Sequence, residues 1–366
     1  MKILYLVTKS EIGGAQTHVF DLAKHFKMQG HEIAIMSSPG GWLAQKSESL
    51  KIKYYPNDFF INTFNPAVMM QAGDALKECL KDFQPDIVHC HSSFSGIVGR
   101  MTIKNRIPTF FTAHGWSFND GVPWIQKVLG IVTEKICAKY SEKIICCSNF
   151  VKELGMKYKI APEEKFAVIY NGVQPSEVNL EDKFKNIDIV KIVMIARLAE
   201  PKNPFLLINA YDLLDEETKN KSQVTIIGDG PQTKILRDLV RDNNLFEKIK
   251  FTGMVDHGEI PDYLKNAHIF ALPSKWEGFP YTIIEAMNYG LAIIASDVGG
   301  IKEAVSSDCG ILIKEDDSSI WAENLAKLIN NFDLIKKMGE NSYRKLKDEF
   351  DIKIMFDTIL NLYKNK

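Results

Sequence analysis

The sequence contains few cysteines and no long apolar segment. Six cysteines occur among 366 residues, and no two of them have the CxxC spacing. We therefore expect buried thiols in a reducing compartment rather than disulfides or a structural zinc site. No run of about 20 apolar residues is present to span a membrane. The apolar run at residues 3–7 is too short for a signal peptide. A cytoplasmic protein is expected, with peripheral contact at the cytoplasmic face of the membrane left open.

The sequence also lacks an excess of charge of either sign. Its formal net charge is −1, which argues against a protein that binds nucleic acid through bulk positive charge. His89, Cys90 and His91 adjoin in the chain, but neighbouring residues on a strand point to opposite faces, so this triplet is weak evidence for a metal. A hydrophobic content of 45% and a charged content of 25% are typical of globular proteins, and the length predicts two domains.

Short apolar runs alternate with segments of helical periodicity along the whole chain. The runs lie at residues 3–7, 32–36, 87–90, 109–112, 143–147 and 166–170, and, after a polar linker at 174–186, at 190–196, 224–228, 249–251, 268–272, 292–296 and 310–313. Continuous apolar runs are typical of strands buried on both faces of a parallel sheet. The pattern predicts two doubly wound α/β domains, with ligands at the carboxyl ends of the strands. Residues 319–366 are predicted to be helical, with a break near Phe350 and Asp351.

The segment at residues 273–290 carries two glutamates, Glu277 and Glu285, eight positions apart. Pro280 suits the first turn of a helix and Gly290 suits its end. The backbone N–H groups near such a helix start attract anions. Two carboxylates beside an anion site suit a nucleotide-sugar, which has hydroxyls at both ends and phosphate between them. Spacing alone favours the alternative that both glutamates lie on a solvated face.

Four other loops follow predicted strands. Gly13 and Gly14 allow close approach to a phosphate or sugar, although the spacing is not that of a dinucleotide-binding G-x-G-x-x-G loop. His114 follows one strand, and a lone histidine is more often structural. Arg197 and Lys202 follow another strand, and a guanidinium fork with a lysine charge suits a diphosphate. The loop at residues 228–231, Gly-Asp-Gly-Pro, is explained equally well as a turn.

Over nearly its whole length, the sequence resembles the retaining glycosyltransferases of family 4, which have the GT-B fold. The matching segments, in the order of the family, are GGAQTHV, TAHGW, IYNGV, ARLAEPKNP, IIGDGP and PSKWEGFPYTIIEAMNYGLAIIASDVGGIKE. The run with two glutamates is the most specific, and the N-terminal segments look most like capsule and exopolysaccharide transferases. Asn203 and Leu291-Ala292 depart from the common pattern without changing a functional side chain.

The resemblance implies two Rossmann-like domains that face each other across a cleft. Residues 1–172, with a returning C-terminal helix at 351–366, would form the acceptor domain, and residues 173–350 the nucleotide-sugar donor domain. It implies catalytic roles for His114, Glu277, Arg197 and Lys202. The donor-binding residues would be Gly14, Arg197, Lys202, Val255, Glu277, Gly278, Phe279 and Glu285, and those for the acceptor would be Gln16, Trp116 and Phe118. No metal and no cofactor is expected.

The resemblance implies transfer of a hexose or N-acetylhexosamine from a nucleotide-diphosphate sugar, expected to be a UDP-sugar. The acceptor would be a saccharide or a polyprenyl-diphosphate-linked saccharide in bacterial surface polysaccharide assembly. Two alternatives are a nucleotide-sugar epimerase and a non-catalytic nucleotide-sugar-binding subunit. Residues 124–131 are rich in apolar side chains. One interpretation is a surface for a polyprenyl-diphosphate-linked acceptor at the membrane. For most of these residues a helix facing the core is the favoured interpretation.

Overall fold

A computed structural model describes residues 1–119, 122–185 and 187–366. The chain divides into two compact units. Unit 1 comprises Met1–Asn171 and Met355–Lys366, and unit 2 comprises Gly172–Ile354. The boundaries predicted from the sequence are 172/173 and 350/351.

Unit 1 is built on a parallel sheet of seven strands in the order β3-β2-β1-β4-β5-β6-β7. Its central strands are buried on both faces, as their continuous apolar sequences require. The elements are β1 (Lys2–Val7), α1 (Gly14–Met28), β2 (Glu32–Ser37), α2 (Gly41–Ser49), β3 (Lys53–Pro56), α3 (Pro66–Phe83), β4 (Ile87–His91), α4 (Ser93–Ile103), β5 (Thr109–Ala113), α5 (Trp124–Ala138), β6 (Ile144–Cys146), α6 (Asn149–Lys157), η1 (Glu163–Lys165), β7 (Phe166–Val168) and α16 (Ile352–Lys364).

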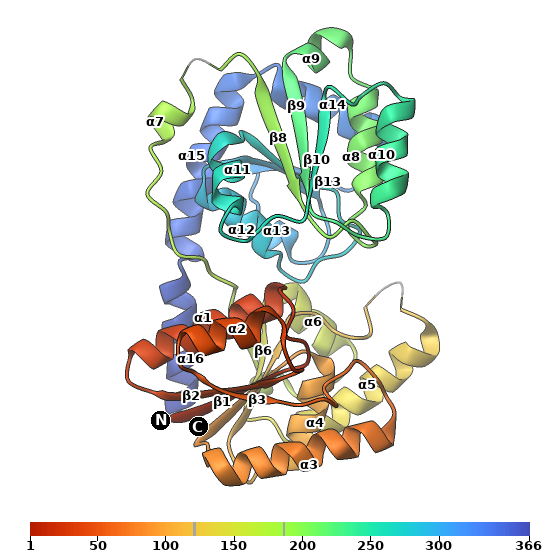
Figure 1. The fold of residues 1–366 in the computed structure, drawn as a ribbon. Coiled ribbons are helices and arrows are strands. Elements are labelled where there is room, and N and C mark those ends of the chain that lie inside the picture. Colours follow the sequence, from red (N-terminus) through yellow and green to blue (C-terminus); the bar gives the residue numbers. More distant parts are fainter. Residues whose placement is uncertain (120–121, 186) are drawn as a thin grey trace. The chain divides into compact units, whose positions relative to one another are not determined.

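Helices cover both faces of this sheet (Figure 1). Helices α1 and α2 lie on one face, and α3, α4 and α5 lie on the other. The C-terminal helix α16 packs on α1, where the ring of Phe356 stacks on His25 with centroids 3.9 Å apart. The hydroxyl of Tyr363 lies 2.6 Å from Nδ1 of His89 on β4. The end of the chain is thus part of the core of unit 1, as the fold class predicted.

Unit 2 has a parallel sheet of six strands in the order β10-β9-β8-β11-β12-β13. Helices α8, α10 and α14 lie on one face, and α11, α12 and α15 on the other (Figure 1). The elements are α7 (Leu180–Lys183), β8 (Val190–Ile195), α8 (Pro204–Asp212), α9 (Glu216–Asn220), β9 (Ser222–Ile227), α10 (Thr233–Asp242), β10 (Ile249–Gly253), α11 (Ile260–Asn266), β11 (Ile269–Leu272), α12 (Tyr281–Asn288), β12 (Ala292–Ser296), α13 (Ile301–Ala304), β13 (Gly310–Ile313), α14 (Ser318–Ile329) and α15 (Phe332–Glu349).

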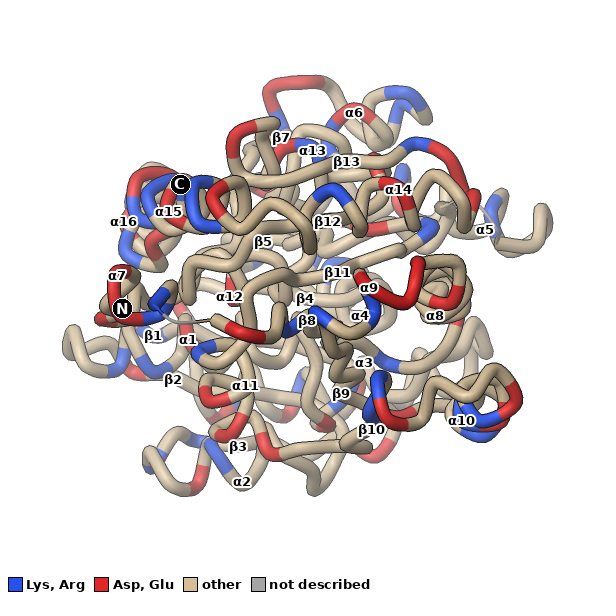
Figure 2. The backbone as a smooth tube through the Cα atoms, turned by 90° about the horizontal axis from the view of Figure 1, so that it is seen from above, with Lys and Arg blue, Asp and Glu red and all other residues tan. Residues whose placement is uncertain are grey.

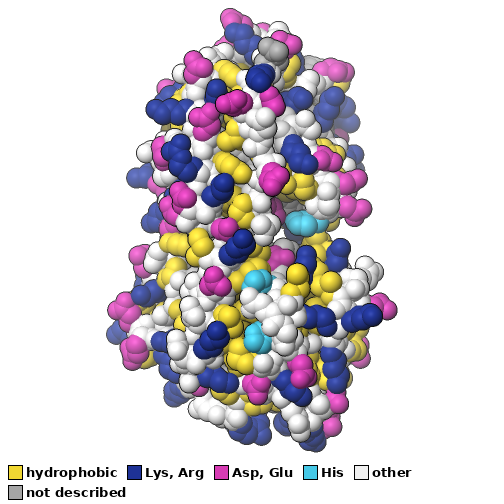
Figure 3. Space-filling view, turned by 90° about the vertical axis from the view of Figure 1, so that its left-hand side faces the viewer, with side chains coloured by type: hydrophobic (Ala, Val, Ile, Leu, Met, Phe, Trp, Pro, Cys, Tyr) yellow, Lys and Arg dark blue, Asp and Glu magenta, His cyan; other side chains and the backbone are white. Residues whose placement is uncertain are grey.

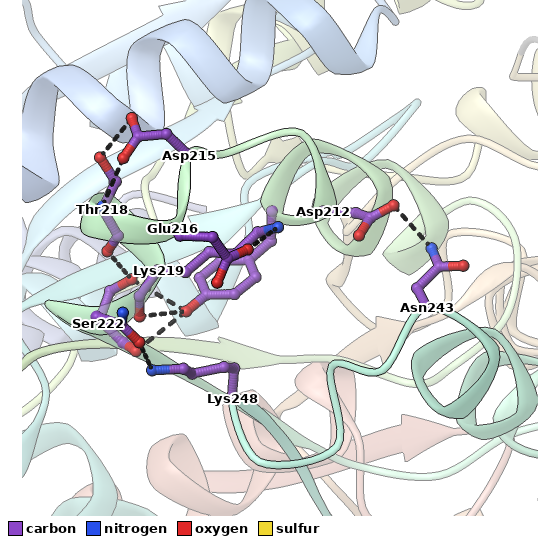
Figure 4. Close-up of polar contacts among 10 residues, drawn as sticks. Asp212, Asp215, Glu216, Thr218, Lys219, Ser222, Asn243 and Lys248 are labelled. Carbon is purple, nitrogen blue, oxygen red and sulfur yellow. Dashed lines mark hydrogen bonds and ion pairs between the residues drawn. The ribbon is translucent and has the colours of Figure 1, made fainter.

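Polar contacts fix the corner where α8 leads through α9 into β9 (Figure 4). Asp215 caps α9 by accepting from the backbone N–H of Thr218 at 2.8 Å and from its hydroxyl at 3.0 Å. The buried hydroxyl of Tyr211 lies 3.0 Å from both the hydroxyl and the carbonyl oxygen of Ser222. These contacts replace lost hydration at a chain reversal and anchor the first residue of β9.

All twelve predicted strands are present, and each differs in length from its prediction by at most two residues. The structure adds β3 and the helices α2, α7 and α9, which were not predicted. Strand β3 was missed because it lies at the sheet edge, where its side chains are half-buried or exposed and its sequence, KYYP, has no apolar run. The C-terminal helical region contains the predicted break after Glu349 and a second one at Asn330 and Asn331, which was not predicted; there the side chain of Asn331 caps α15.

Candidate functional site

The loops that carry the predicted donor residues of unit 2 come from two neighbouring strands. Strand β8 pairs with β9 on one side and β11 on the other, and the direction of winding reverses between β8 and β11. Ligands of doubly wound sheets bind at such a reversal, beyond the carboxyl ends of the strands. The loop after β8 holds Arg197 and Lys202, and the loop after β11 holds Glu277. Seventy-five positions separate Lys202 from Glu277, yet the fold brings them into contact.

Lys202 and Glu277 form an ion pair. Nζ of Lys202 lies 2.5 Å from Oε1 of Glu277, and the hydroxyl of Ser274 donates to the same oxygen at 2.7 Å. The Glu277 side chain is 9% exposed and that of Lys202 26% exposed, so the pair lies at the edge between interior and solvent. The lysine is therefore held in place before any ligand arrives. Ser274 was not predicted as a site residue, although its position three residues before Glu277 in the same loop was a usable signal.

A turn of two glycines supports the backbone of Glu277. Gly300 donates its N–H to the carbonyl oxygen of Glu277 at 3.2 Å. Gly299 has φ of +56°, and a Cβ added there would lie 1.9 Å from the same carbonyl oxygen. Any other residue at position 299 would displace Glu277. The glycines were quoted only as part of a motif, because their contact with Glu277 arises from the pairing of β11 with β12.

Helix α12 begins directly after this loop. Pro280 occupies the N-cap position, one residue earlier than predicted, and no side chain caps the helix by a hydrogen bond. Gly278 and Phe279 are buried between Glu277 and the helix start. The partial positive charge of the helix N-terminus therefore lies beside the Lys202–Glu277 pair.

Glu285 lies one turn into α12 and is partly buried. Burial raises the pKa of this carboxyl from 4.5 to about 7. Among the residues that the structure describes, Glu285 forms no hydrogen bond or ion pair that would offset this cost. A carboxylate held at such a cost on a site helix is a candidate for ligand binding. The interpretation of both glutamates as a solvated face is wrong, because neither side chain is fully exposed.

The remaining predicted donor residues of unit 2 lie on surface loops. Arg197 is exposed, and Val255 is half-buried in the loop after β10. Gly230 follows β9, where an added Cβ would lie 2.3 Å from the carbonyl oxygen of Leu198, so the β8 and β9 loops touch through their backbones. Within the described residues Arg197 forms no ion pair with Lys202's partner Glu277, and its role in holding a diphosphate stays a prediction.

Unit 1 has the same winding reversal, between β1 and β4. Thr8 and Ser92 join the loops that follow these two strands. The hydroxyl of Ser92 accepts from the Thr8 N–H at 3.1 Å and lies 2.7 Å from the Thr8 hydroxyl. Ser92 has φ of +69°, which is uncommon without glycine. Gly14 is the first residue of α1, and the amide of Gln16 donates to the carbonyl oxygen of Lys9 at 3.1 Å. Both predicted residues thus lie in the first turn of α1, directly after the loop that follows β1.

His114, the first residue after β5, belongs to a cluster of histidine rings in unit 1. Nε2 of His114 lies 3.2 Å from Nδ1 of His91, and the ring of His18 lies edge-on to His114 with centroids 5.0 Å apart. His89 lies behind His91, with ring centroids 4.1 Å apart. Side chains two positions apart on a strand point to the same face, so His89 and His91 share one face of β4. The proximity of these two rings could therefore have been predicted from the sequence.

The cluster is electrically neutral at neutral pH. Burial, and then the charge of His18, hold the pKa of His114 well below its usual value. Burial also lowers the pKa of His91 and His89 strongly, and that of His18 to about 4. His114 can therefore donate or accept a hydrogen bond as a neutral ring. A free histidine can change its charge near neutral pH, but burial keeps the His114 ring neutral there.

The two predicted acceptor rings are used for packing. Trp116 is 3% exposed and Phe118 fully buried; their rings stack with centroids 5.2 Å apart, and the indole N–H donates to the carbonyl oxygen of Val151 at 2.8 Å. These rings have no surface with which to contact an acceptor in this structure. The expectation that most apolar residues of the following helix face the core is also wrong, because Trp124, Ile125, Val128 and Leu129 are exposed.

No group of three or more His, Cys, Asp or Glu side chains in residues 1–119, 122–185 and 187–366 is arranged to hold a metal ion. Over the same residues, every helix is too short or too polar to pass through a bilayer.

Comparison with known proteins places the chain in a family. The model for Glycosyltransferase Family 4 matches residues 12–177, and the model for Glycosyl transferases group 1 matches residues 177–345. The UDP-Gal:alpha-D-GlcNAc-diphosphoundecaprenol alpha-1,3-galactosyltransferase of Escherichia coli is 30% identical over 303 residues, which cover 79% of this chain and 78% of that protein. The capsular polysaccharide biosynthesis glycosyltransferase CapH of Staphylococcus aureus is 25% identical and matches 100% of this chain and 99% of its own length.

Solved structures share the fold. Anabaena HepE in complex with UDP-glucose superposes with a TM-score of 0.83 at 18% identity, over 100% of both chains. The two Rossmann-like units are those of the GT-B fold. The chain belongs to the family 4 glycosyltransferases, and the predicted family and fold class are confirmed.

Proposed function

We propose that this protein transfers a hexose or N-acetylhexosamine from a UDP-sugar to a saccharide or polyprenyl-diphosphate-linked acceptor during assembly of a bacterial surface polysaccharide. The reaction retains the anomeric configuration and needs no metal ion. The names of the E. coli galactosyltransferase and of CapH support the acceptor class and the pathway type, and the UDP-glucose complex of HepE supports the donor class.

The observation that carries the proposal is the Lys202–Glu277 pair beside the start of α12. In the proposed complex, Lys202 and Arg197 neutralise the donor diphosphate, and the amides of Gly278 and Phe279 add the field of the helix start. Glu277 accepts hydrogen bonds from the sugar hydroxyls while it keeps Lys202 in position. Glu285 accepts from the ribose hydroxyls, and the backbone around Val255 seats the base.

The chemistry follows from these charges. When the bond between the anomeric carbon and the β-phosphate oxygen breaks, negative charge grows on the β-phosphate, where preorganised cations stabilise it. The acceptor hydroxyl attacks the same face of the sugar, and its proton passes to the departing phosphate oxygen. In this proposal unit 1 supplies Gly14, Gln16 and the neutral ring of His114, whose hydrogen bond to the sugar is not lost to protonation.

A polyprenyl-linked acceptor lies in a membrane, so the proposal includes peripheral contact with the cytoplasmic membrane face. That contact is separable from the transfer reaction and can be measured without donor or acceptor.

The test is a transfer assay followed by mass spectrometry. The protein is incubated with UDP-glucose, UDP-galactose, UDP-N-acetylglucosamine and UDP-N-acetylgalactosamine, each with and without an N-acetylglucosaminyl diphosphate-lipid acceptor and with EDTA in parallel. We expect a product one sugar heavier, with the α-linkage of its α-configured donor. Epimerised donor without acceptor would identify an epimerase, and intact donor with every acceptor but measurable UDP binding would identify a non-catalytic subunit. Lys202→Ala serves as the control that should lose transfer.

A further inference from the structure

Helix α5 is turned with its large apolar side chains outward. The six that are exposed, by 43% to 73%, are Trp124, Ile125, Val128, Leu129, Val132 and Ile136. The residues buried against the rest of unit 1 are Gly130, Glu134, Cys137 and Ala138. A surface helix normally places its apolar stripe inward and its charges outward. An apolar patch of this size on a water-facing helix marks an interaction surface.

The buried acidic side chain fixes this orientation. Oε2 of Glu134 accepts from the guanidinium of Arg100 on α4 at 2.8 Å, and both side chains are at most 1% exposed. The guanidinium also lies 3.9 Å from the ring centroid of Phe111. Rolling α5 to bury its apolar side chains would break this pair and leave a buried charge unpaired. The apolar face is therefore held outward by the fold itself.

The charged side chains of α5 that are not fully buried are all basic. Lys135 and the adjoining Lys139 are exposed, and Lys127 is half-buried. Lys135, Lys139 and Lys159 line a pocket of about 640 Å³, and none of the three forms an ion pair within the residues described. The pocket contains one acidic residue, Glu163, which pairs with Lys152 at 2.9 Å. This surface thus combines apolar side chains with uncompensated positive charge.

Elsewhere the charges of the protein are mixed. On the face drawn in Figure 3, acidic and basic side chains are interspersed, and Figure 2 shows both signs along most of the chain. The near-zero net charge conceals the local excess around α5.

We propose that α5 lies on the surface of an anionic phospholipid bilayer, which receives the apolar side chains of α5 at the level of its headgroups while Lys135, Lys139 and Lys159 bind lipid phosphates. An amphipathic helix with a basic border binds a bilayer in this way without crossing it. A second copy of this chain is the poorer occupant, because a two-fold interface would set the same lysines against one another.

This inference deepens the proposed function, since a lipid-linked acceptor would be held at the same surface. Only the biological purpose of the membrane contact depends on the proposed function, and the contact itself does not. Vesicle binding needs neither donor nor acceptor, so loss of vesicle binding and loss of glycosyl transfer are separate results.

The experiment is co-flotation with vesicles of phosphatidylcholine alone and of phosphatidylcholine with 30% phosphatidylglycerol, at about 0.1 M and 0.5 M salt. The full chain should float with the anionic vesicles and much less with neutral ones or at high salt. A basic side chain near such a surface contributes roughly fivefold in affinity, so Lys135→Ser, Lys139→Ser and Lys159→Ser together should weaken binding on the order of 100-fold. Val128→Asp with Val132→Asp should abolish it.

Matched substitutions on α10 serve as controls. Ile235 is 60% exposed and Lys234 neighbours it, so Ile235→Asp and Lys234→Ser make the same changes on another surface and should leave flotation unchanged. Unaltered thermal unfolding of every variant shows that the fold persists. Flotation of the α5 variants equal to that of the unmodified chain, or no flotation of the unmodified chain, would overturn the proposal. A dimer in light scattering that Val128→Asp with Val132→Asp dissociates would make a second copy the occupant and equally overturn it.

Discussion

Replacing Glu285 by glutamine should stabilise unit 2 at alkaline pH. Burial raises the pKa of this carboxyl from 4.5 to about 7. A raised pKa means that the folded state keeps the proton when the unfolded state has lost it. The free energy of unfolding therefore falls as the pH rises from about 4.5 to about 7, and the full cost is present above pH 7.

The shift sets the size of the effect. At roughly 1.4 kcal/mol per pKa unit, a rise from 4.5 to about 7 corresponds to about 3 kcal/mol. Residual contact of Glu285 with solvent makes this figure an upper bound. For a domain of this size, about 3 kcal/mol corresponds to a change in Tm of roughly 6–12 °C. Glutamine has the shape of the acid and no charge, so Glu285→Gln should recover most of this stability at pH 8 and little at pH 4.5.

Calorimetry of both proteins between pH 4.5 and pH 8.5 measures the difference directly. Comparing variant and unmodified chain at each pH cancels the titration of all other groups. Glu323→Gln on α14, an exposed position, is the control and should give no such pH dependence. UDP should raise the Tm of the unmodified chain more than that of Glu285→Gln, if the carboxylate binds ribose. A difference in Tm that is the same at pH 5 and pH 8 would refute the reasoning.

Four further results are expected. Lys202→Ala should weaken UDP binding in calorimetry by about 1.5–3 kcal/mol, because a charge-assisted contact to the diphosphate is lost; equal affinity would remove Lys202 from the donor site. Glu277→Gln should lower kcat more than UDP affinity, and unchanged turnover would exclude it from the sugar site. His91→Phe should lower kcat while leaving UDP affinity intact, because it removes the hydrogen bond that orients His114; full activity would show that the cluster is only structural. Glu134→Ala should cost about 3–5 kcal/mol of stability by leaving Arg100 buried and unpaired, as urea unfolding will report.

The loops of the site could be located from the sequence because the signals that mark them are local. Apolar runs identified the strands, and the residues just after them include Arg197, Lys202, Glu277 and His114. The contact between Lys202 and Glu277 could not be read locally, because it depends on β8 lying beside β11. Gly299 was missed for the same reason, since it contacts Glu277 from the loop after β12. Ser274 lies in the same loop as Glu277, so its contact could have been anticipated from the sequence.

Burial was the property that sequence predicted least well. Trp116 and Phe118 were expected to meet an acceptor and instead pack in the interior, whereas the apolar side chains of α5 were mostly expected in the core and face water. Helical periodicity identifies an apolar stripe but not the partner that covers it. In α5, Glu134 points inward because it pairs with Arg100 on α4, and the apolar stripe on the opposite side of α5 therefore faces solvent.

The amino-acid sequence by itself determined the architecture and the family: alternating apolar and helical periods specify two doubly wound sheets, and the loop motifs are those of family 4 glycosyltransferases. The tertiary structure decided the ionisation of Glu285 and the histidines, the pairing of Lys202 with Glu277, and the side of α5 that meets solvent. These properties depend on desolvation and on charges supplied by residues remote in the chain, and only the packed fold brings those residues together.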